Sequence, residues 1–178
     1  MKKEIIIAGF GGQGVLSMGK ILAYAGLMDN LDVTWMPSYG PEQRGGTANV
    51  TVILSDEGPI SSPVLDTYDV AVLLNQQSLD KFESKVKPGG TLIYDPYSIH
   101  HAPQRTDINI VAVPAMDATL QMESAKAYNM VLLGALLKTR GLVEVEAVMK
   151  GLKKTLPERH HHLLPMNRNA ILKGMELV

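Results

Sequence analysis

The chain has 178 residues, of which 20% are charged and 46% hydrophobic, and its formal net charge is −1. That length suits a single domain with a core of its own, and the near-neutral charge disfavours nucleic acid as a partner. The sequence contains no cysteine, which excludes a disulfide, a thiol nucleophile, a zinc–thiolate site and the usual ligands of an iron–sulfur cluster.

The N-terminal segment supplies neither a membrane span nor an export signal. No apolar run reaches the roughly 18 to 20 residues that cross a bilayer, and the run that starts at Ile5 is too short for the core of a signal peptide. We therefore expect a cytoplasmic protein with no membrane partner.

Short apolar runs alternate with segments of helical spacing. Glu4–Gly9 is predicted to be a buried strand, and Val15–Met28 has the apolar spacing of a helix. Thr47–Leu54 alternates polar and apolar residues, which is typical of a half-buried strand and is compatible with antiparallel pairing. Further strands are predicted at 33–36 (closed by Pro37), 70–74, 91–94 and 108–113, and further helices at 78–86, 116–139, 144–156 and 163–177, with a turn at 88–90.

This alternation predicts one α/β domain over residues 1–178. We expect a three-layer arrangement, with helices on both faces of a mainly parallel sheet, because parallel strands need crossover helices. The chain ends in helices, which are expected to cover one face or to reach a partner.

The first unusual motif is Gly9-Phe10-Gly11-Gly12-Gln13-Gly14, which has G-x-G-x-x-G spacing between a strand and a helix. Glycines permit a tight turn, and the free N–H groups of the helix start favour an anion. A dinucleotide site would also need an acid at the end of the second strand, but that strand ends Trp35-Met36-Pro37 and Asp32 stands at its beginning. An anion-binding or backbone-contact loop is favoured, and a purely structural turn stays open.

The second unusual stretch runs from Ser38 to Gly46 and reads Ser38-Tyr39-Gly40-Pro41-Glu42-Gln43-Arg44-Gly45-Gly46. It follows a strand end, where open α/β sheets place their ligand crevice. Arg44 beside two glycines could present a guanidinium and backbone N–H groups to a phosphate or carboxylate. The alternative is a long hairpin connection with solvated Glu42 and Arg44.

Catalytic and metal motifs are not apparent in the sequence. His100-His101 and His160-His161-His162 are adjacent residues that point in different directions, so surface or helix-start histidines are favoured over metal ligands. No serine stands in a nucleophile motif, and no phosphate-binding P-loop motif occurs. We assign no catalytic residue to this chain.

Four stretches together resemble one family: residues 9–14, 37–46, Asn75–Phe82 and Asn129–Ala135. The chain is similar to the gamma subunit of the 2-oxoacid:ferredoxin oxidoreductases, most like those for 2-oxoglutarate or 2-oxoisovalerate. The resemblance covers nearly the whole chain, and Gln43 stands where that family often has Met. The implied candidate contact residues are Gly9, Gly11, Gly12, Gln13, Gly14, Ser38, Tyr39, Gly40, Glu42, Arg44, Gly45, Gly46 and Asn75.

The resemblance implies one subunit of an enzyme that decarboxylates a 2-oxoacid on thiamine diphosphate, reduces ferredoxin and releases an acyl-coenzyme A. Thiamine diphosphate and the iron–sulfur clusters would lie on the alpha, beta and ferredoxin-like partner subunits. A contact of this chain with coenzyme A and a role in assembly alone are both left open. The isolated chain is expected to be inactive and to form a homodimer or expose a partner surface, with residues 116–130 and 163–178 as candidates.

Two other functional classes compete with this interpretation. One is a free-standing Rossmann-like oxidoreductase that binds a dinucleotide, and the other is a scaffold that binds no small molecule. The two glycine loops follow strand ends, so they are expected to lie side by side at one edge of the sheet.

Overall fold

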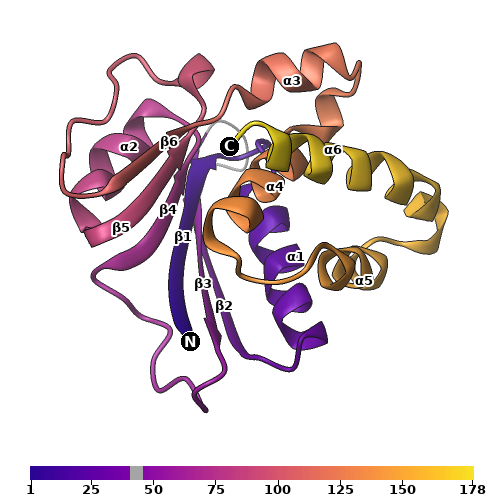
Figure 1. Cartoon of the computed structure of the whole chain (residues 1–178), viewed down its shortest axis with the longest axis horizontal. Helices are drawn as coiled ribbons and strands as arrows, with labels where there is room; N and C mark the ends of the chain where they lie inside the picture. The colour runs from indigo at the N-terminus through magenta and orange to yellow at the C-terminus, as the bar shows by residue number, and fades with distance from the viewer. Residues whose placement is uncertain (41–45) are drawn as a thin grey trace.

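A six-stranded sheet with helices packed on it makes up the described part of the chain, residues 1–40 and 46–178 of the computed structural model (Figure 1). The strands are β1 (Lys2–Phe10), β2 (Asp32–Tyr39), β3 (Thr47–Ser55), β4 (Tyr68–Leu73), β5 (Val86–Tyr94) and β6 (Asn109–Ala112). The helices are α1 (Val15–Met28), α2 (Gln76–Phe82), α3 (Ala115–Gln121), α4 (Tyr128–Arg140), α5 (Val145–Thr155) and α6 (Leu164–Glu176).

The strand order is β2-β3-β1-β4-β5-β6. β1, β4, β5 and β6 pair in parallel, whereas β3 pairs antiparallel with both β1 and β2. β3 is therefore the reversed strand of the sheet, inserted between β1 and β2. The prediction of a mainly parallel α/β sheet is confirmed. The strand predicted at 47–54 is antiparallel, the pairing with which its pattern is compatible. The prediction that it is half-buried is wrong, because residues 50–55 are all buried and both faces of this strand are therefore covered.

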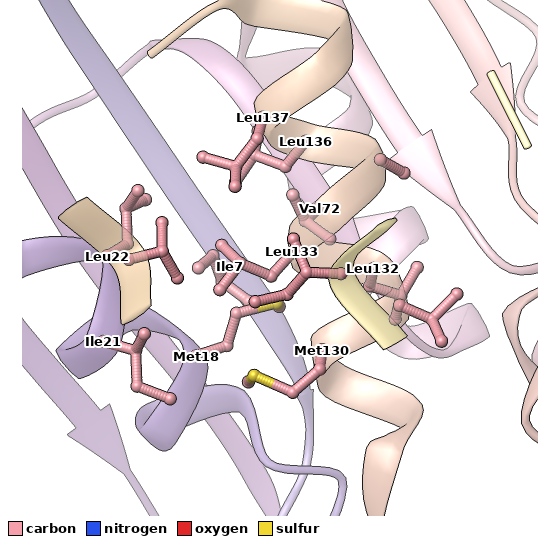
Figure 2. Close-up of a cluster of buried hydrophobic side chains, with 14 of the residues drawn as sticks. Ile7, Met18, Ile21, Leu22, Val72, Met130, Leu132, Leu133, Leu136 and Leu137 are labelled. Atoms are coloured by element: carbon pink, nitrogen blue, oxygen red, sulfur yellow. The ribbon is translucent and has the colours of Figure 1, made fainter. Parts of the chain in front are cut away.

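Side chains on the two faces of the sheet build two separate apolar clusters. On one face, Ile5 and Ile7 of β1 and Val72 of β4 pack with α1, α3, α4, α5 and α6. Figure 2 shows the centre of this cluster, where Met18 and Leu22 of α1 meet the leucines of α4.

On the opposite face, Ile6, Ala8 and Leu92 pack against Leu79 and Phe82 of α2. Helices thus lie on both faces of the sheet, as predicted. The division is uneven, because among the described residues α2 is the one α-helix on its face.

Two predicted boundaries in the first half of the chain are wrong. The strand predicted at 33–36 continues through Pro37 to Tyr39. Proline is tolerated there because β2 is an edge strand, and an edge strand can lack an outward N–H at no cost to the ladder. The turn predicted at 88–90 lies within β5, where Gly89 has a φ of 74° and its N–H donates to Asp107 O.

The long helix predicted from Met116 to Thr139 is also wrong, because it is divided into α3, a 3-10 turn and α4. Glu123 takes a left-handed φ of 53°, and the N–H of Ser124 returns to Thr119 O, which ends α3. Across the described residues, no helix combines the length and apolar character that a membrane crossing requires.

Candidate functional site

The first glycine motif forms a tight turn between β1 and α1. Gly12 and Gly14 have φ angles of 98° and 78°, a region that side-chain-bearing residues rarely adopt. Gly14 is the N-cap of α1, and among the described residues no side chain caps it. The first turn of this 14-residue helix contains no acidic residue, so its first N–H groups carry the partial positive charge of the N-terminus without a carboxylate from the helix itself.

Gln13 holds this turn against two strands. Its Oε1 accepts the N–H of Phe10 at 2.6 Å, and its Nε2 donates to Leu74 O at 3.1 Å. The side chain thereby joins the carboxyl ends of β1 and β4. We predicted Gln13 as a contact residue, and the structure places its side chain in the support of the turn.

Gly9 leaves the space in which the Gln13 amide lies. A Cβ at Gly9 would come within 2.5 Å of Gln13 Oε1 and 2.9 Å of Leu74 Cβ. On the α4 side, Asn129 Nδ2 donates to Gly14 O at 3.4 Å. The glycine turn is therefore held by side chains from both of its flanks.

The ends of the second glycine-rich stretch lie beside the first motif. Ser38 and Tyr39 are the last residues of β2, and Gly40 N–H donates to Thr47 O at 3.2 Å. The N–H of Gly11 donates to Gly46 O at 2.9 Å, so the two glycine motifs meet as predicted. Pro41, Glu42, Gln43, Arg44 and Gly45 lie outside the described residues.

A pocket of about 540 Å³ opens where the two motifs meet, and we call it the glycine-loop pocket. The turn and the start of α1 form one wall, and the end of β2 and the start of β3 form the other. Two aromatic residues, Phe10 and Tyr39, line it, and Tyr39 is 71% exposed. The full lining is Phe10, Gly11, Gly12, Gly14, Val15, Leu16, Ser17, Tyr39, Gly46, Thr47 and Ala48.

A smaller pocket of about 400 Å³ lies on the other side of the glycine turn. Gln13 and Gly14 line it from one side. The other side is lined by Lys126 of the 3-10 turn before α4 and by Tyr128 and Asn129 at the start of α4. Burial and the nearby Asp95 raise the pKa of the Tyr128 hydroxyl well above its usual range, because both disfavour the phenolate. The glycine turn is thus a partition between two pockets.

Asn75 does not line either pocket. It is buried, and its Oδ1 accepts the N–H of Ser78 at 2.7 Å as the N-cap of α2. Its Nδ2 has no hydrogen-bond partner among the residues that the structure describes. The geometry gives Asn75 a capping role at the carboxyl end of β4.

Asp95 is a buried carboxylate at this edge of the sheet that the sequence analysis missed. Its two oxygens accept the N–H groups of Tyr97 at 3.0 Å and of Met116 at 2.9 Å, so it fixes the end of β5 to the start of α3. The sequence signal was present: an Asp directly before Pro96, after a strand, is typical of a capping residue.

The strand order speaks against a nicotinamide or flavin dinucleotide site. In the dinucleotide fold, the acid that binds the ribose ends the strand next to β1. Here the reversed β3 occupies that place, β2 is one strand further away, and it ends in Ser38-Tyr39. Open α/β sheets bind such ligands at the topological switch point, between the carboxyl ends of two neighbouring strands. In this chain the side-chain amide of Gln13 already bridges the carboxyl ends of β1 and β4.

One histidine of the 160–162 cluster lies against backbone carbonyl groups. His161 Nε2 lies 2.9 Å from Leu156 O and 3.1 Å from Lys153 O, at the C-terminal end of α5. In the described ranges, no group of three His, Asp or Glu side chains is arranged to hold a metal ion.

Comparison with known proteins identifies the family. Residues 4–177 match the pyruvate ferredoxin/flavodoxin oxidoreductase family. The chain belongs to this family. Over 175 residues, 97% of this chain, it is 40% identical to the ketoisovalerate oxidoreductase subunit VorA of Methanothermobacter thermautotrophicus, of which those residues cover 36%. The chain therefore spans about a third of the length of that relative.

Two solved structures resemble this one over 99% of the chain. The gamma subunit of a keto/oxoacid ferredoxin oxidoreductase from Geobacter sulfurreducens has 31% identity and a TM-score of 0.84, with 96% of its chain covered. A 2-oxoglutarate:ferredoxin oxidoreductase from Magnetococcus marinus, solved with 2-oxoglutarate, coenzyme A and succinyl-CoA bound, has 28% identity and a TM-score of 0.88. The match covers 31% of that chain, so this fold occurs both as a separate subunit and within a longer polypeptide.

Proposed function

We propose that this chain is the gamma subunit of a multi-subunit 2-oxoacid:ferredoxin oxidoreductase that works in the cytoplasm with alpha, beta and ferredoxin-like partners. The observation that carries the proposal is the match over 96% of the Geobacter gamma subunit, combined with family membership over residues 4–177. The partner subunits would hold thiamine diphosphate and the iron–sulfur clusters, and this chain would carry no catalytic residue. Ferredoxin would be the acceptor of the complex.

We further propose that the glycine-loop pocket contacts coenzyme A in the assembled enzyme. The longer Magnetococcus relative is a protein in which coenzyme A and its succinyl thioester are bound. Coenzyme A combines an adenine ring with several phosphates. The pocket offers Phe10 and Tyr39 for the ring and the uncapped start of α1 for an anion, so its chemistry matches both parts of this ligand.

In this role the residues of this chain would bind and orient coenzyme A, and the bond-making steps would take place on the partner subunits. Gln13 fixes the glycine turn through two hydrogen bonds, so the N–H groups at the start of α1 would be oriented before a ligand binds. A preorganised anion site binds without the cost of ordering a loop. Thiamine diphosphate, when bound by the partners, supplies the electron sink for decarboxylation.

A kinetic experiment on the assembled complex tests the pocket. Tyr39→Ala is expected to raise the KM for coenzyme A about fivefold or more with little change in kcat, because it removes uniform binding energy. Tyr97→Ala is a matched control, since Tyr97 is 69% exposed and lies outside the glycine-loop pocket. Equal KM values for the two variants would show that Tyr39 does not contact coenzyme A.

Self-association of the isolated chain is a further proposal. Exposed apolar side chains occur in both predicted partner segments: Leu120 is 64% exposed in the first, and Leu172 and Val178 are 39% and 40% exposed in the second. A homodimer would cover such groups in the absence of the other subunits. Light scattering of the purified chain checks this, and a monomer at high concentration would contradict it.

A further inference from the structure

The C-terminal end of α5 and the turn after it concentrate positive charge. Residues 150–162 contain Lys150, Lys153, Lys154 and Arg159 against a single carboxylate, Glu158, although the whole chain has a formal net charge of −1. All four basic side chains belong to exposed residues. We call these four residues the basic patch.

The fold presents the basic patch outward on a rigid support. Ala147, Val148 and Leu152 of α5 face the core, and Gly151 lies so close to α1 that a Cβ there would approach Ala25 N to 3.0 Å. The lysines at 150, 153 and 154 therefore occupy the opposite side of the helix. His161 fixes the following turn through its contacts with Lys153 O and Leu156 O.

The positive charge of the patch is not neutralised within the described part of the molecule. Lys150, Lys153, Lys154 and Arg159 form no ion pair with any described residue, whereas neighbouring Arg168 is paired with Glu146 at 2.5 Å. Lysines in a last helical turn compensate the helix dipole, which accounts for Lys153 and Lys154. It does not account for Lys150, one turn earlier, or for Arg159, which lies beyond the helix.

The basic patch lies at a distance from the proposed coenzyme A site. Figure 1 shows α5 and the turn before α6 at the end of the molecule away from the sheet, whereas the glycine turn lies where β1 meets α1. The pocket linings at the glycine turn contain none of the four basic residues. The patch is therefore a separate surface of this chain.

We propose that the basic patch is a docking surface for a carboxylate-rich face of another protein. Charge complementarity is the argument: clustered, unpaired and outward-facing cations steer and orient an acidic partner at long range. Nucleic acid fits less well, because residues 141–178 contain no Phe, Tyr or Trp for base stacking and the chain is acidic overall. A lipid surface fits less well too, because the apolar side of α5 is buried against α1.

Three probes and two variants test this proposal. The probes are a fluorescent ten-residue poly-glutamate peptide, a single-stranded RNA 20-mer and vesicles with 30% phosphatidylserine, each titrated with the full chain at low salt. The patch variant is Lys150→Glu/Lys153→Glu/Lys154→Glu. The control, Lys20→Glu/Lys81→Glu/Lys138→Glu, reverses three exposed lysines on α1, α2 and α4 and so makes the same change in net charge.

The peptide is expected to bind the wild-type chain more tightly than the other two probes do. The patch variant should lower peptide affinity more than tenfold, the control less than twofold, and 300 mM salt should weaken wild-type binding strongly. Equal losses in both variants would overturn the proposal, because binding would then follow net charge alone. A loss confined to RNA or vesicles in the patch variant would overturn it in favour of that other partner.

Discussion

At the scale of single residues, the side chain of Gln13 stabilises the glycine turn by hydrogen bonds to backbone groups. The sequence favours an anion-binding or backbone-contact loop at the glycine motif and leaves a structural turn open. The motif's one polar side chain, that of Gln13, donates to Leu74 O just after β4 and accepts from Phe10 N–H of β1. Gly9 is required because any side chain there would collide with the Gln13 amide. Sequence alone predicts the turn, but which way Gln13 points depends on β4, some 60 residues later.

Gln13→Leu is expected to lower the free energy of unfolding by about 1–3 kcal/mol, because the Phe10 N–H and the Leu74 carbonyl lose their partner. Gln121→Leu is the control, since Gln121 is exposed at the end of α3 and its side chain forms no hydrogen bond with a described residue. Urea unfolding of both variants measures the effect. An equal loss in the two would mean that the Gln13 bonds contribute nothing net.

A second residue-scale feature is an ion cluster at the opposite end of the sheet. Glu4 of β1 accepts from Lys87 Nζ at 2.5 Å, and Lys87 also lies 3.0 Å from Asp69. Burial opposes ionisation of Glu4, but hydrogen bonds from Lys2 and Lys87 outweigh it and lower the pKa of this carboxyl below 4.5. Burial likewise opposes the charge on Lys87, and the two carboxylates outweigh it and raise the pKa of the ammonium.

These shifts predict how stability depends on pH. A lowered folded pKa for Glu4 contributes stability above about pH 4.5, the ordinary value, and this contribution is lost as the pH falls through the folded pKa. Glu4→Gln should therefore lower the free energy of unfolding by about 1–2 kcal/mol at pH 7 and by much less at pH 3. Glu176→Gln, at an exposed pair with Lys173, should cost almost nothing at either pH. Urea unfolding at both pH values checks it, and a pH-independent cost for Glu4→Gln would contradict the linkage.

At the scale of elements, the contact between α4 and α6 depends on two glycines. A Cβ at Gly134 would collide with the carbonyl oxygen of Ile171, and a Cβ at Gly174 would collide with that of Val131. The two helices therefore touch backbone to backbone. Sequence periodicity predicted helical structure in both segments, with α4 as part of one longer helix, but it could not predict this contact. A glycine within a helical pattern indicates only a lower helix propensity.

Gly134→Ala separates two opposing effects. Helix propensity favours alanine by about 1 kcal/mol, whereas the collision forces α4 and α6 apart. We expect the packing effect to dominate and the free energy of unfolding to fall by about 2 kcal/mol or more. Asn169→Ala, on an exposed position of α6, should change it by less than about 0.5 kcal/mol. Thermal unfolding decides, and a stabilised Gly134→Ala would contradict the close contact.

The sequence predicted elements better than their ends. The strand–helix alternation and the existence of a strand at 47–54 were foreseeable from periodicity. The direction of that strand was left open, and its burial on both faces was not predicted. The break at Glu123 was not foreseeable, since Met116–Thr139 is continuous in its helical spacing and the left-handed residue is neither glycine nor asparagine. The contact between Gly11 and Gly46 could be predicted, because Gly11 follows the end of β1 and Gly46 belongs to the loop that follows the end of β2, at the same edge of the sheet. The presence of two pockets at that edge could not be predicted, because one wall of the smaller pocket comes from α4, which is distant in the sequence.

At the scale of the whole molecule, the cysteine-free sequence bears on the role proposed for the chain. Without cysteine it offers no thiolate ligand for an iron–sulfur cluster, and its described surfaces hold a pocket with no assigned catalytic group. The purified chain is therefore expected to give no viologen-dye reduction with a 2-oxoacid and coenzyme A. Adding the alpha, beta and cluster-bearing subunits should produce activity that depends on both substrates, and omitting this chain from that mixture should abolish it. Dye reduction by the chain alone would contradict the subunit role, and full activity of the mixture without it would show that the chain is dispensable to the reaction.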